Sequence, residues 1–95
     1  MSRPKYPWWG YVREILRRYP NRTTAAETAA VEYAITHTEH MVDGQSRLSV
    51  IQMVFFQKTH TLQGAALEVP CGYETAKRWQ QSFLLLVAQK RGLLD

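Results

Sequence analysis

The fold is decided by the stretch Thr61-Leu-Gln-Gly-Ala-Ala-Leu-Glu-Val-Pro-Cys-Gly-Tyr-Glu-Thr-Ala-Lys-Arg-Trp79. Its central residues Pro70-Cys71-Gly72 interrupt a helix, because proline lacks an amide hydrogen and clashes with the preceding turn, while glycine relaxes the backbone. Before this break, the small side chains of Ala65 and Ala66 allow another helix to approach closely. After it, Ala76 and Trp79 mark one face of a new helix. The stretch therefore predicts two short helices joined by a tight turn, the second of them basic.

Helical spacing of apolar residues continues outward from this stretch. An apolar stripe between Pro7 and Pro20 indicates a first helix, because proline suits the start of a helix and ends one that it follows. Residues expected at helix ends and turns are Thr24 with Glu27 (a capping box), Asp43-Gly44 (a turn), Ser46 (an N-cap) and Gly92 (a C-terminal cap). The helices predicted are approximately residues 8–19, 25–40, 47–59, 62–69 and 73–91. Since no stretch shows convincing alternation, we expect an all-α fold of five helices.

The composition is that of one folded domain. The chain has 95 residues, of which 45% are apolar and 21% are charged. Residues 1–95 are expected to form a single helical domain, with an aromatic and basic N-terminal half (1–44) and a C-terminal half (45–95) that contains the opening stretch. The net charge of +4 favours a polyanionic partner, nucleic acid before a membrane surface.

Cysteine content and hydropathy predict the compartment. The single cysteine, Cys71, forms no internal disulfide, which is typical of a reducing, intracellular environment. The N-terminus has no apolar core of signal-peptide length, and the apolar run Phe83–Ala88 is far too short to span a membrane. We therefore expect a cytoplasmic protein with no membrane partner.

Residues 61–79 resemble the helix-turn-helix of sigma factor region 4. In that family a Thr-Leu pair opens the first helix, a small residue sits midway, and a turn precedes a basic second helix; here Thr61-Leu62, Ala65-Ala66, Pro70-Cys71-Gly72 and residues 73–79 match these parts. The usual turn has glycine before a branched aliphatic residue, whereas this chain has Pro70 before Cys71, which can still act as the buried small apolar residue. Residues 46–95 more widely resemble the C-terminal half of the ArpU/RinA-type transcriptional regulators of Gram-positive phages. The resemblance implies a transcriptional regulator of phage or mobile-element type that binds double-stranded DNA.

The second helix of the pair would carry the DNA contacts. Its face opposite Ala76, Trp79 and Phe83 presents the predicted DNA-binding residues, which are Tyr73, Glu74, Thr75, Lys77, Arg78 and Gln81. Lysine and arginine can reach phosphate or a guanine edge, and hydroxyl and amide groups can hydrogen-bond bases. The free N–H groups at the helix start suit a phosphate. The alternative interpretation is that these residues are the solvated face of a terminal helix.

The N-terminal half combines aromatic and basic residues. Trp8, Trp9 and Tyr11 either cover the core or form a partner surface for RNA polymerase, another host protein or a second copy in a homodimer. Residues 1–7 are expected to form an extended arm. A second basic region comprises Arg3, Lys5, Arg13, Arg17, Arg18 and Arg22. These residues either contact DNA phosphates beside the main interface or keep the protein soluble.

Enzymatic and metal-binding functions are not expected. His37 and His40 can share a helix face, with Glu39, His60 and Cys71 as further candidates, but no second cysteine or tight ligand pair lies nearby. The carboxylates are spread out, and no glycine-rich phosphate loop is present, so we predict a non-enzyme without cofactor or metal. The alternative function is a phage-encoded protein-interaction module or inhibitor of a host polymerase or defence nuclease. A packaging or recombination factor is a third interpretation.

Overall fold

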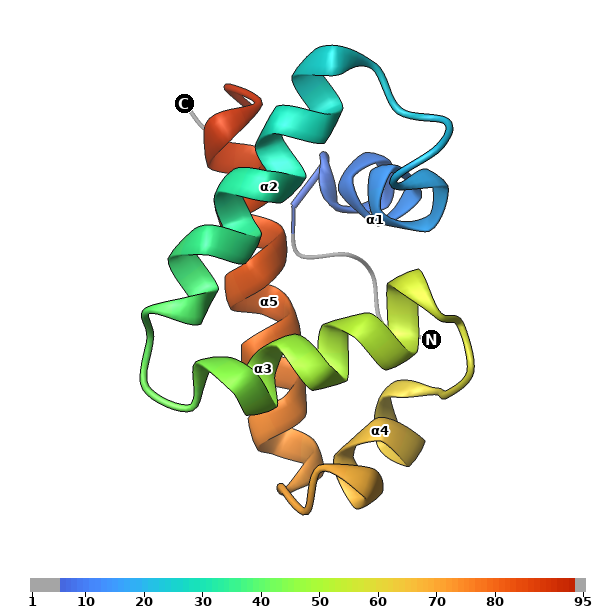
Figure 1. Cartoon of the computed structure of the whole chain (residues 1–95), viewed down its shortest axis with the longest axis vertical. Helices are drawn as coiled ribbons and strands as arrows, with labels where there is room; N and C mark the ends of the chain where they lie inside the picture. Colours follow the sequence, from blue (N-terminus) through green and yellow to red (C-terminus); the bar gives the residue numbers. More distant parts are fainter. Residues whose placement is uncertain (1–5, 94–95) are drawn as a thin grey trace.

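The computed structural model describes residues 6–93, and these form helices and turns without any strand (Figure 1). The predicted all-α fold of five helices is confirmed. The elements are α1 (Trp9–Arg18), α2 (Ala25–Glu39), α3 (Gly44–Ile51), the short π-helix η1 (Gln52–Phe56), α4 (Leu62–Glu68) and α5 (Tyr73–Lys90). The predictions for Arg3, Lys5 and the first part of the N-terminal arm lie outside the described residues.

Local signals fix several helix ends where they were predicted. At the start of α2, the Thr24 hydroxyl accepts a hydrogen bond from the Glu27 amide at 3.2 Å, and the Glu27 carboxylate accepts one from the Thr24 amide at 3.0 Å, so the capping box is confirmed. After α5, Gly92 adopts a left-handed φ of 74°, and the Leu93 amide donates to the Ala88 carbonyl at 2.9 Å. This is the glycine cap that the sequence predicts.

The predicted start of α3 is wrong. The sequence indicates a helix from Arg47 with Ser46 as its cap, but α3 begins at Gly44, and Asp43 occupies the N-cap position without a side-chain hydrogen bond. Gly44 is buried against the last turn of α2, where an added Cβ would lie 2.5 Å from the Thr38 carbonyl oxygen. The missing side chain of Gly44 therefore lets α3 begin directly against α2.

The predicted end of this helix also differs, because the α-helical hydrogen bonding stops at Ile51 instead of continuing to Thr59. In η1 the hydrogen bonds widen by one residue, as in the 2.7 Å bond from the Gln57 amide to the Gln52 carbonyl. Phe55 of this segment is only 1% exposed in the main core. The α-helix thus gives way to a wider turn in which Phe55 stays buried.

The main hydrophobic core lies between α1, α2, α5 and the α3–η1 segment. Its buried members are Val12, Ile15, Leu16, Ala30, Val31, Ala34, Ile51, Phe55, Phe83, Leu84, Val87 and Ala88. The longest helix, α5, runs along the back of the molecule in Figure 1, with α2 beside its C-terminal half and α3 crossing its N-terminal half. None of the helices within residues 6–93 is long and apolar enough to cross a membrane.

Candidate nucleic-acid interface

The helix break at residues 69–72 occurs where the sequence predicts it. Thr61 caps α4 by accepting a hydrogen bond from the Gly64 amide at 3.1 Å. After α4, the Cys71 amide donates to the Ala66 carbonyl at 2.9 Å, and Gly72 takes an extended conformation with ψ of 151°. The chain then enters α5 at Tyr73, so α4 and α5 are separate helices joined by a tight turn.

A second, smaller core holds this turn in place. Its fully buried residues are Val50 from α3, Ala65 and Ala66 from α4, and Ala76 from α5. Because three of these side chains are single methyl groups, α4 can approach α5 and α3 closely, as the alanine pair predicts. Cys71 is partly buried against this cluster, in the place of the small apolar residue expected for the turn.

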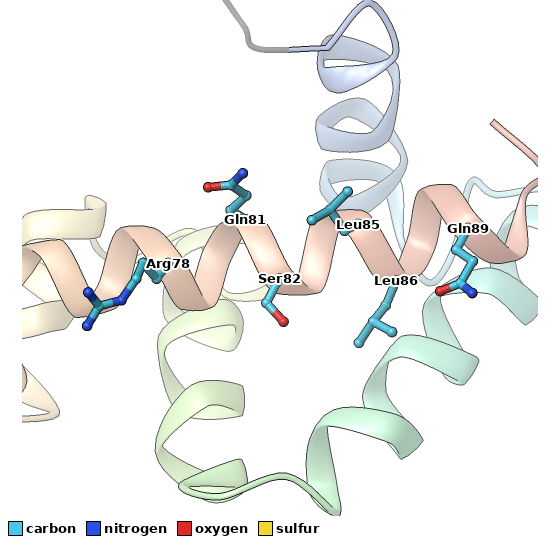
Figure 2. A pocket seen from close by; sticks show the side chains of 6 residues that line it. All are labelled: Arg78, Gln81, Ser82, Leu85, Leu86 and Gln89. Carbon is cyan, nitrogen blue, oxygen red and sulfur yellow. The ribbon is translucent and has the colours of Figure 1, made fainter. Parts of the chain in front are cut away.

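The six predicted DNA-binding residues lie together on the first turns of α5. The exposed ones are Tyr73, Glu74, Lys77 and Arg78, and the half-exposed ones are Thr75 and Gln81. Figure 2 shows Arg78 and Gln81 on the outer side of α5, with the Arg78 side chain reaching back toward the helix start. The opposite face is buried at Ala76, Phe83 and Val87, so the predicted division between core and surface is observed.

The two cations of this surface, Lys77 and Arg78, have different electrostatic partners. The Lys77 ammonium lies 2.9 Å from a Glu74 carboxylate oxygen and 5.0 Å from the centre of the Tyr73 ring. The hydrogen bond that Lys77 donates to Glu74 is the main cause that raises the pKa of Lys77, so this lysine stays protonated at neutral pH but is already paired. Arg78 instead donates to the Thr75 hydroxyl at 3.3 Å and has no carboxylate partner among residues 6–93. Arg78 is therefore the cation most available to an anionic ligand.

The start of α5 adds a backbone contribution. Gly72, at its N-cap position, makes no side-chain hydrogen bond to the first turn. No side chain among residues 6–93 caps the amides of the first turn, so the positive end of the helix dipole is offset there only by Glu74, the acidic residue of that turn. An anion such as phosphate is favoured at such a position.

Arg47 contacts Trp79, the residue that follows Arg78 in α5, but is absent from the set that the sequence predicts. It extends from α3 so that its guanidinium carbon is 5.7 Å from the centre of the Trp79 ring on α5. No short-range sequence signal connects the two residues, which belong to helices that meet only in the folded chain.

The predicted partner surface is largely engaged in packing. Trp8 and Trp9 are half-buried against the main core, and the Tyr6 ring stacks on Trp8 at 4.9 Å between centroids. Tyr11 is 37% exposed, and its hydroxyl donates to the Glu27 carboxylate at 2.7 Å. These contacts show that Trp8 and Trp9 cover the core and that Tyr11 connects α1 to Glu27. A partner role for Trp8, Trp9 and Tyr11 stays a prediction.

The arginines of the second basic region have different surroundings. Arg18 forms an ion pair with the buried carboxylate of Glu27 at 3.2 Å, and Arg17 lies 3.9 Å from Glu14. The Arg13 guanidinium lies over the Phe55 ring at 5.5 Å, and burial is the main cause that lowers its pKa. Arg18 is therefore used within the fold rather than for binding phosphate.

The residues considered for metal binding do not come together. His40 contacts the Thr36 carbonyl, the His37 ring packs on Tyr33, and His60 lies 3.9 Å from Glu68. Within the part of the chain that the structure describes, no group of three histidine, cysteine, aspartate or glutamate side chains is placed to hold a metal ion.

Comparison of the chain with protein-family models, with curated proteins and with solved structures found no match.

Proposed function

We propose that the protein is a sequence-specific DNA-binding transcriptional regulator, of phage or mobile-element type, in which α4 and α5 act as a helix-turn-helix. The observation that carries the proposal is the exposed start of α5, where Arg78 stands free of carboxylates beside an uncapped helix N-terminus. Net charge of +4 supports the same kind of partner. The protein binds without catalysis and acts in the cytoplasm, where its single thiol stays reduced.

The mechanism is insertion of α5, from Tyr73 onward, into the major groove of double-stranded DNA. Arg78 exchanges its long hydrogen bond to Thr75 for a guanine edge, and Gln81 hydrogen-bonds an adjacent base. Lys77 contacts phosphate, because its ammonium can leave Glu74 for a stronger anion. Glu74 is then free to accept a hydrogen bond from a cytosine amino group. Direct readout thus rests on Arg78, Gln81 and Glu74.

Alanine substitutions separate these roles. We expect Arg78→Ala to weaken binding to a preferred duplex by about 1–3 kcal/mol and to flatten the preference at one base position. Lys77→Ala should weaken all duplexes alike and reduce the slope of log K against log salt by about one. Fluorescence anisotropy titrations at several salt concentrations measure both effects.

Lys90→Ala is the matched control, because it removes one positive charge from the far end of the same helix. Its titration should follow that of the unmodified protein. Equal binding by the unmodified protein and by both the Arg78 and Lys77 variants would contradict the proposed mode of binding.

A second candidate function is binding to a protein, and one surface feature favours it. From Gln81 to Gln89 the outer face of α5 carries no charge and forms a shallow groove lined partly by Leu85 and Leu86 (Figure 2). On α4, Leu67 is 79% exposed. Depletion of charge is typical of the centre of a protein interface. Weak, sequence-blind DNA binding together with tight capture of one host protein, such as RNA polymerase or a defence nuclease, favours this function.

A further inference from the structure

Arg47 is fixed in place by three contacts. Its Nε donates to the Val42 carbonyl at 2.9 Å, and its Nη1 lies 3.5 Å from the Met41 sulfur. Its guanidinium is held near the Trp79 ring, with 5.7 Å between the guanidinium carbon and the ring centre. These contacts come from the loop before α3 and from α5, so the side chain is oriented before any ligand binds.

The same guanidinium keeps unused donors. An arginine has five N–H groups, and the contacts above engage one on Nε and one on Nη1. Both N–H groups on Nη2 are without a partner in residues 6–93, and no carboxylate lies within ion-pair distance of Arg47 there. A positioned guanidinium without a carboxylate partner can donate the free N–H groups of Nη2 to phosphate oxygens.

The position of Arg47 places these donors beside the candidate interface. Trp79 directly follows Arg78 in α5, and Figure 1 shows α3 crossing the N-terminal half of α5. One residue corresponds to about 100° of rotation around an α-helix, so the half-buried Trp79 lies between the buried face of α5 and the exposed Arg78, and Arg47 packs on α5 at that edge of the exposed face.

We propose that Arg47 binds a backbone phosphate of the duplex that α5 enters, and so sets how the helix is inserted. This inference rests on the proposed DNA-binding function. Contacts to phosphate fix the register of a protein on DNA without reading its sequence. Because the Trp79 ring and the Val42 carbonyl already orient the arginine, little conformational entropy is lost on binding.

The test uses Arg47→Gln, which removes the charge while keeping a planar polar group that can pack on Trp79. We expect affinity for preferred and unrelated duplexes to fall by the same factor, about 3–10-fold, and the salt slope to decrease by about one. Arg47→Lys restores the charge and should recover most of the salt slope. Lys90→Ala, at the far end of α5, removes the same charge elsewhere and should bind like the unmodified protein.

The outcomes distinguish this inference from the function on which it rests. If Arg78→Ala loses base preference while Arg47→Gln titrates like the unmodified protein, the phosphate contact is wrong and the proposed function stands. If Arg47→Gln binds more weakly with an unchanged salt slope and a lower melting temperature, Arg47 has a structural role and the inference is again overturned. Failure of the unmodified protein to bind any duplex at low salt overturns both.

Discussion

Replacing Glu27 with glutamine should lower the free energy of unfolding by about 3 kcal/mol at neutral pH. The Glu27 side chain is 5% exposed and accepts hydrogen bonds from the Tyr11 hydroxyl at 2.7 Å, the Arg18 guanidinium at 3.2 Å and the Thr24 amide at 3.0 Å. Glutamine cannot neutralise Arg18, and one of its two polar atoms is a donor that faces other donors. The large cost comes from leaving the partly buried Arg18 without its counter-ion.

The same carboxylate makes the free energy of unfolding depend on pH. Hydrogen bonds from Tyr11 first and Arg18 second lower the pKa of Glu27 from 4.5 to about 2. Because the folded-state pKa is lowered, this contribution is fully present above about pH 5 and is lost as pH falls toward 2. We expect the unmodified protein to lose about 2 kcal/mol over this window through Glu27, and Glu27→Gln to lose much less.

Urea denaturation at pH 7, 5 and 3 measures both effects. Glu14→Gln is the control, because Glu14 is exposed and lies 3.9 Å from Arg17, so its loss should change stability by less than about 0.5 kcal/mol. Equal stability of the Glu27 and Glu14 variants at neutral pH would show that the buried network contributes nothing beyond a surface ion pair.

A pair of glycine substitutions should change stability in opposite directions. Gly44→Ala should destabilise the fold by about 2–3 kcal/mol, because the added Cβ would meet backbone oxygens of Thr38 at 2.5 Å and Glu39 at 2.7 Å. Gly10→Ala meets nothing within 4 Å and replaces glycine within α1, so it should stabilise by about 0.5 kcal/mol.

Thermal and urea unfolding of the two glycine variants provide the comparison. The two proteins differ from the parent by the same methyl group, so a difference between them reports the local surroundings. A Gly44→Ala protein as stable as the parent would mean that α3 does not start against the end of α2.

Features encoded by neighbouring residues could be predicted, and features created by tertiary contacts could not. The capping box of Thr24 and Glu27 and the break at Pro70 depend on adjacent residues, so the sequence locates them. The start of α3 depends on carbonyl groups of α2 that approach Gly44 only in the folded chain. The π-helical turn after Ile51 likewise contains Phe55, which is buried in the main core by contacts that only the folded chain makes.

The same distinction holds at the candidate site. The exposed set on α5 follows from helical periodicity, because the period places Ala76 inward and Arg78 outward. The pairing of Glu74 with Lys77 is also a local, three-residue contact. The contact of Arg47 with Trp79 joins two helices whose packing the sequence does not reveal. The contact that makes Arg47 a candidate binding residue could therefore be found only in the folded structure.

The central claim, that the exposed start of α5 reads duplex DNA, is tested most directly by selecting bound duplexes from a random pool with the whole chain. We expect successive rounds to enrich a short motif that contains guanine, and we expect Arg78→Ala to lose that motif while Lys90→Ala retains it. A pool whose sequences stay unchanged through the rounds, or a motif that Arg78→Ala enriches equally well, would contradict the claim.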